Sequence, residues 1–248
     1  AVDALPKSDF FTKQLVGTGG YKFKAFVADQ YLTVVANPDF WRGAPKIAQI
    51  TAKNVTDTSV EILSQERGEI DVIGSKTPAD VVHVQANSKL TVWPGATSIL
   101  QSIGVNNQRP YLSKPVRQAL LYAIDRPTIV KQLFKGTAKL ATPFAAPWVD
   151  QSKLDPFAYN PDKAKQLLKQ ASFPGGQSLE LMAYYTDAFT TQLCAAFQQY
   201  WSDVGIKSTI RQSDFTNLEP DQTAGKWDLM YQGSAAGLDP DEMYIYFN

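Results

Sequence analysis

The sequence is poor in the side chains that most often carry out catalysis or bind metals. Its 248 residues include one histidine, His83, and one cysteine, Cys194. Zinc sites are built mainly from these two residue types, so the composition argues against one. A single cysteine also excludes a disulfide within the chain. Apolar neighbours on both sides of Cys194 predict a buried, inert thiol, and the apolar setting of His83 predicts a packed or surface residue.

Several sequence motifs of known chemistry are missing as well. The run Gly17-Thr18-Gly19-Gly20 lacks the Gly-Lys-Ser/Thr ending of a phosphate loop and precedes a predicted strand. The glycine spacing of a dinucleotide-binding fold and the Gly-x-Ser-x-Gly elbow of serine hydrolases do not occur. No run of about 18 apolar residues is long enough to span a membrane, and no signal peptide is visible.

The charges balance, with 24 Lys+Arg and 24 Asp+Glu residues. A net charge of zero gives no electrostatic reason to expect binding to nucleic acid or to an anionic membrane surface. Hydrophobic residues make up 44% of the chain, enough for a substantial core, and aromatic residues make up 12%. The aromatic rings belong either to that core or to the lining of a pocket.

What is present is an alternation of strand and helix patterns, which is typical of an α/β protein. Residues 21–27 alternate apolar and polar side chains and predict a hairpin with residues 31–35. Asp125, Asn160 and Asp187 each precede a helical pattern and are predicted N-caps, and either Asp57 or Thr58 is predicted to cap the first helix. Further strands are predicted over residues 47–55, 69–73, 90–93, 100–105, 179–185, 206–210 and 227–231, and helices over residues 58–67, 78–86, 116–124, 126–134, 161–171 and 187–204.

Six short strings occur in a fixed order along the chain. They are Gly17-Thr18-Gly19-Gly20-Tyr21, Asn37-Pro38-Asp39-Phe40-Trp41, Gly68-Glu69-Ile70-Asp71-Val72, Val116-Arg117-Gln118-Ala119-Leu120-Leu121-Tyr122-Ala123-Ile124-Asp125-Arg126, Asn160-Pro161-Asp162-Lys163-Ala164 and Val204-Gly205-Ile206. The most specific are the Asn-Pro-x-Phe-Trp signature around Trp41 and the helix pair around Asp125. In this order the strings resemble the peptide/nickel class of extracytoplasmic solute-binding proteins of ABC importers. They belong to the scaffold of that class, and Trp41 is expected to pack as an anchor.

The resemblance implies a periplasmic binding protein-like fold of type II, cluster C, with mixed sheets flanked by helices in two lobes. Family members are about twice this length, and both ends of the chain look cut, so we expect a fragment with an incomplete lobe pair. The composition shifts at Asn106, which predicts that residues 1–105 belong to the first, sheet-rich lobe. Residues 106–248 would then form most of the second lobe.

The same resemblance implies a function without catalysis. It implies capture of a small peptide or other small solute in an inter-lobe cleft, and delivery to ABC permease subunits in the membrane. No cofactor, metal or nucleic acid is expected. The protein would be a monomer located in the periplasm or elsewhere outside the cytoplasm, attached to the membrane if it is a lipoprotein.

The ligand is less well specified than the family. Peptide-binding members hold the ligand's amino group with an aspartate shortly before an Asp-Pro pair, but no aspartate closely precedes Asp239 here. The arginine of dipeptide binders is also missing after residues 179–185, where two tyrosines suit a sugar, an amino-acid derivative or a modified peptide instead. The candidate ligand-binding residues are Tyr184, Tyr185, Asp187, Gln232, Ser234, Ala235, Asp239 and Asn106.

Two alternatives stay open at this point. Asp239 and Asp241 could act as the carboxylates of a hydrolase, although Asp239-Pro240-Asp241 also suits a turn and a helix cap. A sensory module is the other alternative, in which the same fold delivers its ligand to a receptor. Two carboxylates facing each other across a cleft would favour the hydrolase.

Overall fold

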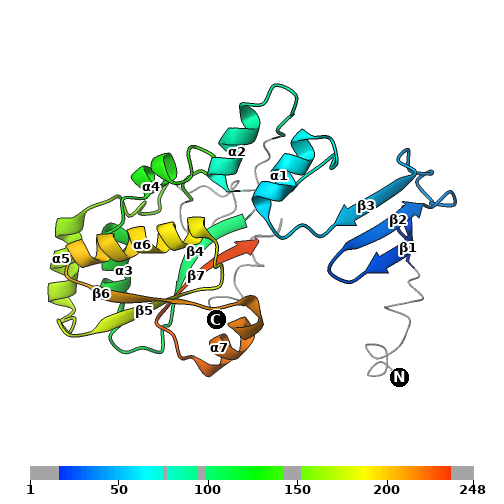
Figure 1. Ribbon diagram of the computed structural model, residues 1–248. Helices are drawn as coiled ribbons and strands as arrows, with labels where there is room; N and C mark the ends of the chain where they lie inside the picture. The colour runs from blue at the N-terminus through cyan, green and yellow to red at the C-terminus, as the bar shows by residue number, and fades with distance from the viewer. Residues whose placement is uncertain (1–16, 75–76, 94–98, 142–151, 236–248) are drawn as a thin grey trace, which may run out of the picture. The chain divides into compact units, whose positions relative to one another are not determined.

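The computed structural model describes residues 17–74, 77–93, 99–141 and 152–235 (Figure 1). The chain divides into two compact units, Ala1–Ser75 and Lys76–Asn248. The sequence places the lobe boundary later, at Asn106. The difference concerns α2 (Pro78–Gln85) and β4 (Ile99–Val105), which both lie in the second unit. β4 belongs there because it hydrogen-bonds along a strand from the C-terminal part of the chain, and the assignment of lobes stays a prediction.

The first unit is an antiparallel sheet followed by one helix. The predicted hairpin is confirmed, and a third strand pairs with its second strand, giving the order β1-β2-β3. The register places Val34 opposite both Phe23 and Ile50. The elements are β1 (Tyr21–Val27), β2 (Tyr31–Ala36), β3 (Gln49–Lys53) and α1 (Thr58–Glu66).

The second unit is built on a mixed sheet with the strand order β4-β7-β5-β6. β5 runs parallel to both β6 and β7, while β4 runs antiparallel to β7. The remaining elements are α3 (Lys114–Tyr122), α4 (Arg126–Gln132), α5 (Pro161–Gln170), β5 (Ser178–Ala183), α6 (Ala188–Asp203), β6 (Lys207–Gln212), the 3-10 turn η3 (Phe215–Asn217), α7 (Leu218–Ala224) and β7 (Leu229–Ala235).

Side-chain caps fix where the helices begin. The predicted caps are confirmed at Asp57, Asp125, Asn160 and Asp187, each of which accepts a hydrogen bond from the backbone N–H three residues later. Each such bond satisfies one of the N–H groups that the first turn of a helix leaves unpaired. The position of these helices is therefore set locally by the sequence.

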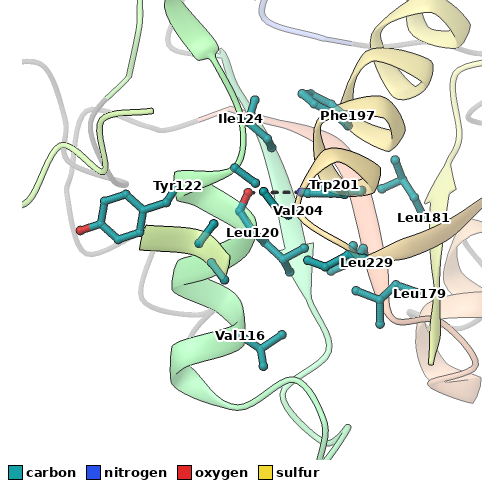
Figure 2. Close-up of a cluster of buried hydrophobic side chains, with 14 of the residues drawn as sticks. Val116, Leu120, Tyr122, Ile124, Leu179, Leu181, Phe197, Trp201, Val204 and Leu229 are labelled. Carbon is teal, nitrogen blue, oxygen red and sulfur yellow. Dashed lines mark hydrogen bonds between the residues drawn. The ribbon is translucent and has the colours of Figure 1, made fainter. Parts of the chain in front are cut away.

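The core of the second unit lies between one face of the sheet and helices α3, α5 and α6 (Figure 2). Trp201 of α6 is fully buried, and its indole N–H donates to the Leu120 carbonyl oxygen at 3.2 Å. Leu181 and Leu229 supply the sheet side of this core. On the opposite face Met182 and Met230 form a smaller cluster near α7, because successive side chains of a strand point to opposite faces. Cys194 is buried in the main core as predicted, and burial raises the pKa of its thiol to about 11.

Three sequence predictions are wrong. Residues 69–73 and 90–93 do not form strands, and among the described residues no strand pairs with either segment. Trp41 does not pack into a core: it is 76% exposed, with Phe40 against its edge and the Arg42 guanidinium 4.9 Å from its ring centroid. The sequence also gave no sign of α7, whose N-cap residue Asn217 makes no side-chain cap bond.

Candidate functional site

The sheet of the second unit reverses its strand order between β5 and β7. From β5 the chain passes through α6 to β6 on one side, and from β6 it returns through α7 to β7 on the other side. The carboxyl ends of β5 and β7 are therefore neighbours at a topological switch point. Open α/β sheets bind ligands in the crevice outside the strand carboxyl ends at such a point. We take this edge of the sheet as the candidate site.

Two polar side chains converge on the backbone of Gly233 at this edge. A Cβ atom on Gly233 would lie 3.1 Å from Gln101 Nε2 and 3.3 Å from the Tyr185 hydroxyl oxygen. Gln101 comes from β4 and stands opposite Gly233 in the register, while Tyr185 follows β5. The ring of Tyr185 packs edge-on to Tyr231, with centroids 6.3 Å apart. The switch point therefore presents an amide and a phenol above a bare backbone.

The two adjacent tyrosines lie on opposite faces of the sheet. Tyr185 packs against the main core, whereas Tyr184 belongs to the smaller cluster near α7. The Tyr184 hydroxyl donates to Met230 Sδ at 2.6 Å and accepts from Gln222 Nε2 at 3.1 Å. Burial raises the pKa of Tyr184 to about 12. The two hydroxyl groups therefore lie in different surroundings, although the two rings meet edge to face with centroids 6.4 Å apart.

Asp187 stands two residues after Tyr185 and caps α6. One carboxylate oxygen accepts from the Thr190 backbone N–H at 3.0 Å, and the other accepts from the Thr190 hydroxyl at 2.8 Å. Both oxygens are thus engaged within the first turn of the helix.

We expect Asp187→Ala to lower the free energy of unfolding by about 1 kcal/mol, because the first turn of α6 loses its cap. Urea unfolding followed by circular dichroism measures this change. Asp187→Asn is the matched control, since asparagine caps as well as aspartate and should stay close to wild type. A loss of stability in Asp187→Asn as large as in the alanine variant would contradict the cap.

Asn106 lies at the opposite edge of the sheet from Tyr185. Its amide donates to the carbonyl oxygens of Trp227 at 2.9 Å and Gly225 at 3.2 Å, and its side-chain oxygen accepts from the Gln108 backbone N–H. The side chain is 8% exposed and ties the end of β4 to the loop before β7.

The other predicted residues come from β7 and the chain after it. Gln232 is half-buried opposite Ser102, on the other face of the sheet from Gly233. Ser234 and Ala235 pair with Leu100 and Ile99 at the candidate edge. Asp239, and with it the carboxylate pair of the hydrolase hypothesis, lies outside the described residues.

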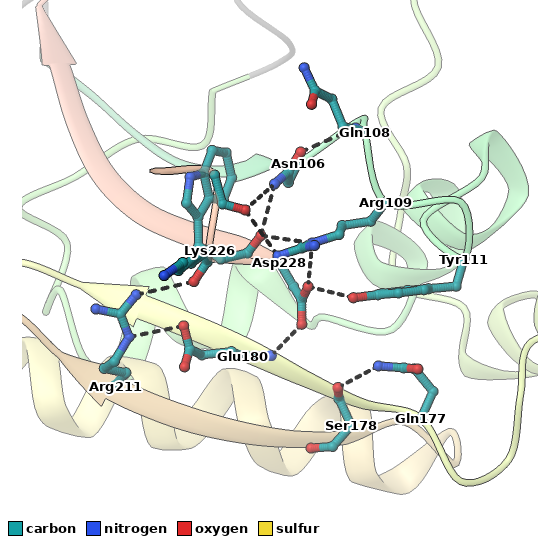
Figure 3. A network of polar contacts seen from close by, with 12 residues as sticks. Asn106, Gln108, Arg109, Tyr111, Gln177, Ser178, Glu180, Arg211, Lys226 and Asp228 are labelled. Carbon is teal, nitrogen blue, oxygen red and sulfur yellow. Dashed lines mark hydrogen bonds and ion pairs between the residues drawn. The ribbon is translucent and has the colours of Figure 1, made fainter. Parts of the chain in front are cut away.

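Sequence reasoning missed Gln101, and it also missed a buried carboxylate at the amino ends of β5 and β7 (Figure 3). Asp228 accepts hydrogen bonds from the Tyr111 hydroxyl at 2.6 Å and the Glu180 backbone N–H at 2.9 Å, and it pairs with Arg109 Nε at 3.2 Å. Burial, together with this hydrogen bond, raises the pKa of Tyr111 to about 12. The available signal for Gln101 was a large polar side chain directly after the apolar pair Ile99 and Leu100 of β4.

The described part of the chain contains no group of three or more histidine, cysteine, aspartate or glutamate side chains placed to hold a metal ion. In the same residues, none of the helices has the length and apolar character needed to cross a membrane.

Comparison with known proteins places the whole chain in one family. Residues 1–248 match the bacterial extracellular solute-binding proteins, family 5. A putative ABC transporter peptide-binding protein of Brucella ovis is 30% identical over 99% of this chain and 48% of its own length. The glutathione-binding protein GsiB of Salmonella choleraesuis is 31% identical over 80% of this chain and 40% of its own length. The chain thus spans about half the length of these relatives.

Solved structures show the same fold. The periplasmic binding protein DppA of Helicobacter pylori, in complex with the peptide STSA, matches 99% of this chain and 48% of its own with a TM-score of 0.82 and 23% identity. NikZ of Campylobacter jejuni, in complex with Ni(L-His), matches 94% of this chain and 49% of its own with a TM-score of 0.79 and 24% identity. All four of these proteins are binding proteins rather than enzymes. The fold is that of the type II periplasmic binding proteins, and the chain belongs to the bacterial extracellular solute-binding proteins of family 5.

Proposed function

We propose that this chain is part of the substrate-binding subunit of an ABC transporter. The observation that carries the proposal is the family match over the full 248 residues. The relative from Brucella ovis is named as a peptide-binding protein of such a transporter. The whole protein would capture a peptide or another small solute outside the cytoplasm, as a monomer, and deliver it to the membrane permease.

The binding cleft would lie between two lobes, with the switch point of the second unit forming one of its walls. Tyr185, the segment from Gln232 to Ala235, and Asp239 would contribute to this wall. In the lobe assignment that we propose, residues 1–105 belong to the first lobe and residues 106–248 to the second. Closure of two lobes around a solute is an established mode of ligand-driven domain motion.

The test is a solute screen on the full-length protein that contains this chain. Di- to pentapeptides, oligosaccharides and nickel chelates are added separately, and thermal stability is measured for each. Binding to the folded state alone stabilises it by an amount that grows with the logarithm of one plus the ligand concentration over its dissociation constant, and so raises the unfolding temperature. If folded protein gains no stability from any solute, and X-ray scattering shows no closure, the capture function is wrong.

A sensory role for the same fold would give the same binding result. It is separated from transport by a second measurement, uptake of the bound solute by cells with and without the gene. Loss of uptake supports transport, whereas unchanged uptake supports delivery of the ligand to a receptor.

A further inference from the structure

The candidate edge carries two polar groups that the fold itself does not use. Among the described residues, neither the Gln101 side chain nor the Tyr185 hydroxyl makes a hydrogen bond. Gln101 is exposed and Tyr185 is half-buried, so water or a ligand can reach both groups. Polar groups held by packing but left without protein partners are available to bind a ligand.

These two groups share one chemical character. An amide and a phenol each donate and accept hydrogen bonds, and neither carries a charge near neutral pH. The ends of β4, β5 and β7 at this edge, residues 99–101, 183–187 and 232–235, contain one charged residue, Asp187. Its carboxylate oxygens are both engaged by Thr190. The described strand ends therefore offer hydrogen bonds without a free charge.

Gly233 lets these two groups lie close to each other. Glycine lacks a side chain, so the Gln101 amide and the Tyr185 hydroxyl both approach the backbone above its Cα. A methyl group there would lie 3.1 Å from Gln101 Nε2, a tighter contact than most Cβ atoms make. The absence of a side chain at position 233 therefore brings the two polar groups to one place.

We propose that Gln101 and Tyr185, whose polar groups meet above Gly233, together recognise an uncharged hydrogen-bonding group of the solute, an amide or a hydroxyl. This inference rests on the proposed capture function and adds the chemistry of the ligand group at the switch point. The amide could come from a peptide and the hydroxyl from a sugar. The two sources are distinguished by the probes below.

The experiment is isothermal titration of the full-length protein with three probes. N-acetyl-trialanine amide presents amides without charged ends, maltotriose presents hydroxyls, and trialanine presents both an ammonium and a carboxylate group. We expect one of the two uncharged probes to bind. Binding of the blocked peptide identifies an amide, and binding of maltotriose identifies a hydroxyl.

The variants test the residues for the probe that binds. We expect Tyr185→Phe and Gln101→Leu each to raise the dissociation constant about three- to tenfold, the effect of losing one hydrogen bond. Gly233→Ala should raise it about tenfold or more, because the added methyl would lie 3.1 Å from Gln101 Nε2 and 3.3 Å from the Tyr185 hydroxyl oxygen and would displace both groups. Tyr159→Phe, which removes a hydroxyl from a 42% exposed ring, is the matched control and should leave binding unchanged.

Charged substitutions of Gln101 distinguish the proposal from recognition of a charged group of the solute. An ammonium group at this edge would make Gln101→Glu bind trialanine more tightly than wild type, and a carboxylate would do so for Gln101→Lys. Either result overturns the inference, as does binding of an uncharged probe that Tyr185→Phe and Gln101→Leu leave unchanged. In those cases the protein still binds a solute, so the capture function stands. If neither uncharged probe binds, the inference fails, and the solute screen decides separately whether the protein captures anything.

Discussion

Replacing Trp201 with alanine should lower the free energy of unfolding by about 3–5 kcal/mol, the usual cost of removing a large buried aromatic side chain. Trp201 is fully buried, stacks against Phe197 with ring centroids 6.0 Å apart, and donates a hydrogen bond to Leu120. Its removal opens a cavity between α3, α6 and the sheet and leaves a carbonyl without that donor. Urea unfolding followed by circular dichroism measures the loss.

Two further variants give the prediction its controls. Trp93 is 81% exposed, so Trp93→Ala removes the same side chain without opening a cavity and should change stability by less than about 0.5 kcal/mol. Trp201→Phe keeps most of the ring but loses the indole N–H, and should lie between alanine and wild type. If Trp201→Ala were as stable as Trp93→Ala, the core between helices and sheet would not be as described.

The features predicted correctly from the sequence are those that depend on a few neighbouring residues. Asp57, Asp125, Asn160 and Asp187 cap helices because each side chain reaches a backbone N–H three residues away. Such a bond needs no tertiary structure. The buried state of Cys194 was likewise visible in its apolar neighbours.

The features predicted wrongly depend on partners far away in the sequence. Residues 69–73 and 90–93 have apolar side chains typical of strands, but a strand also needs a neighbour to hydrogen-bond, and no described strand lies beside them. α7 was missed for the opposite reason: it is seven residues long, contains Pro220, and lacks a side-chain cap, so its local signal is weak.

The candidate site likewise contains features that depend on neighbouring residues and features that depend on distant ones. Strand alternation predicts from the sequence that Tyr184 and Tyr185 belong to opposite faces of the sheet. It does not predict that their rings meet edge to face, with centroids 6.4 Å apart, just beyond the end of β5. The meeting of Gln101 with Gly233 could not be predicted either, because it depends on the register between β4 and β7, 132 positions apart by the difference of their residue numbers. Asn106 was predicted to share a site with Tyr185, but the antiparallel direction of β4 places it at the other edge of the sheet.

Asp228→Ala should destabilise the protein by about 2–3 kcal/mol, because two hydrogen-bond donors lose a buried acceptor and the Arg109 side chain, which is 35% exposed, loses its ion-pair partner. The Asp228 side chain is 11% exposed, and it accepts hydrogen bonds from Tyr111 and from the Glu180 backbone while pairing with Arg109. These three donors come from the loop after β4 and from β5, so one carboxylate holds the ends of three neighbouring strands together (Figure 3). Its loss leaves all three donors short of an acceptor.

The matched control is the ion pair between Lys22 and Asp39 in the first unit. Lys22 Nζ lies 3.3 Å from Asp39 Oδ2, and Arg109 Nε lies 3.2 Å from Asp228 Oδ1, so the two distances are similar. The side chains of Lys22 and Asp39, however, are 53% and 83% exposed. Water already solvates the exposed charges, so Asp39→Ala should cost less than about 1 kcal/mol. Urea unfolding of both variants compares them directly. Equal losses would mean that distance determines the strength of these pairs, whereas a large loss for Asp228→Ala alone would show that burial and the shared hydrogen bonds do.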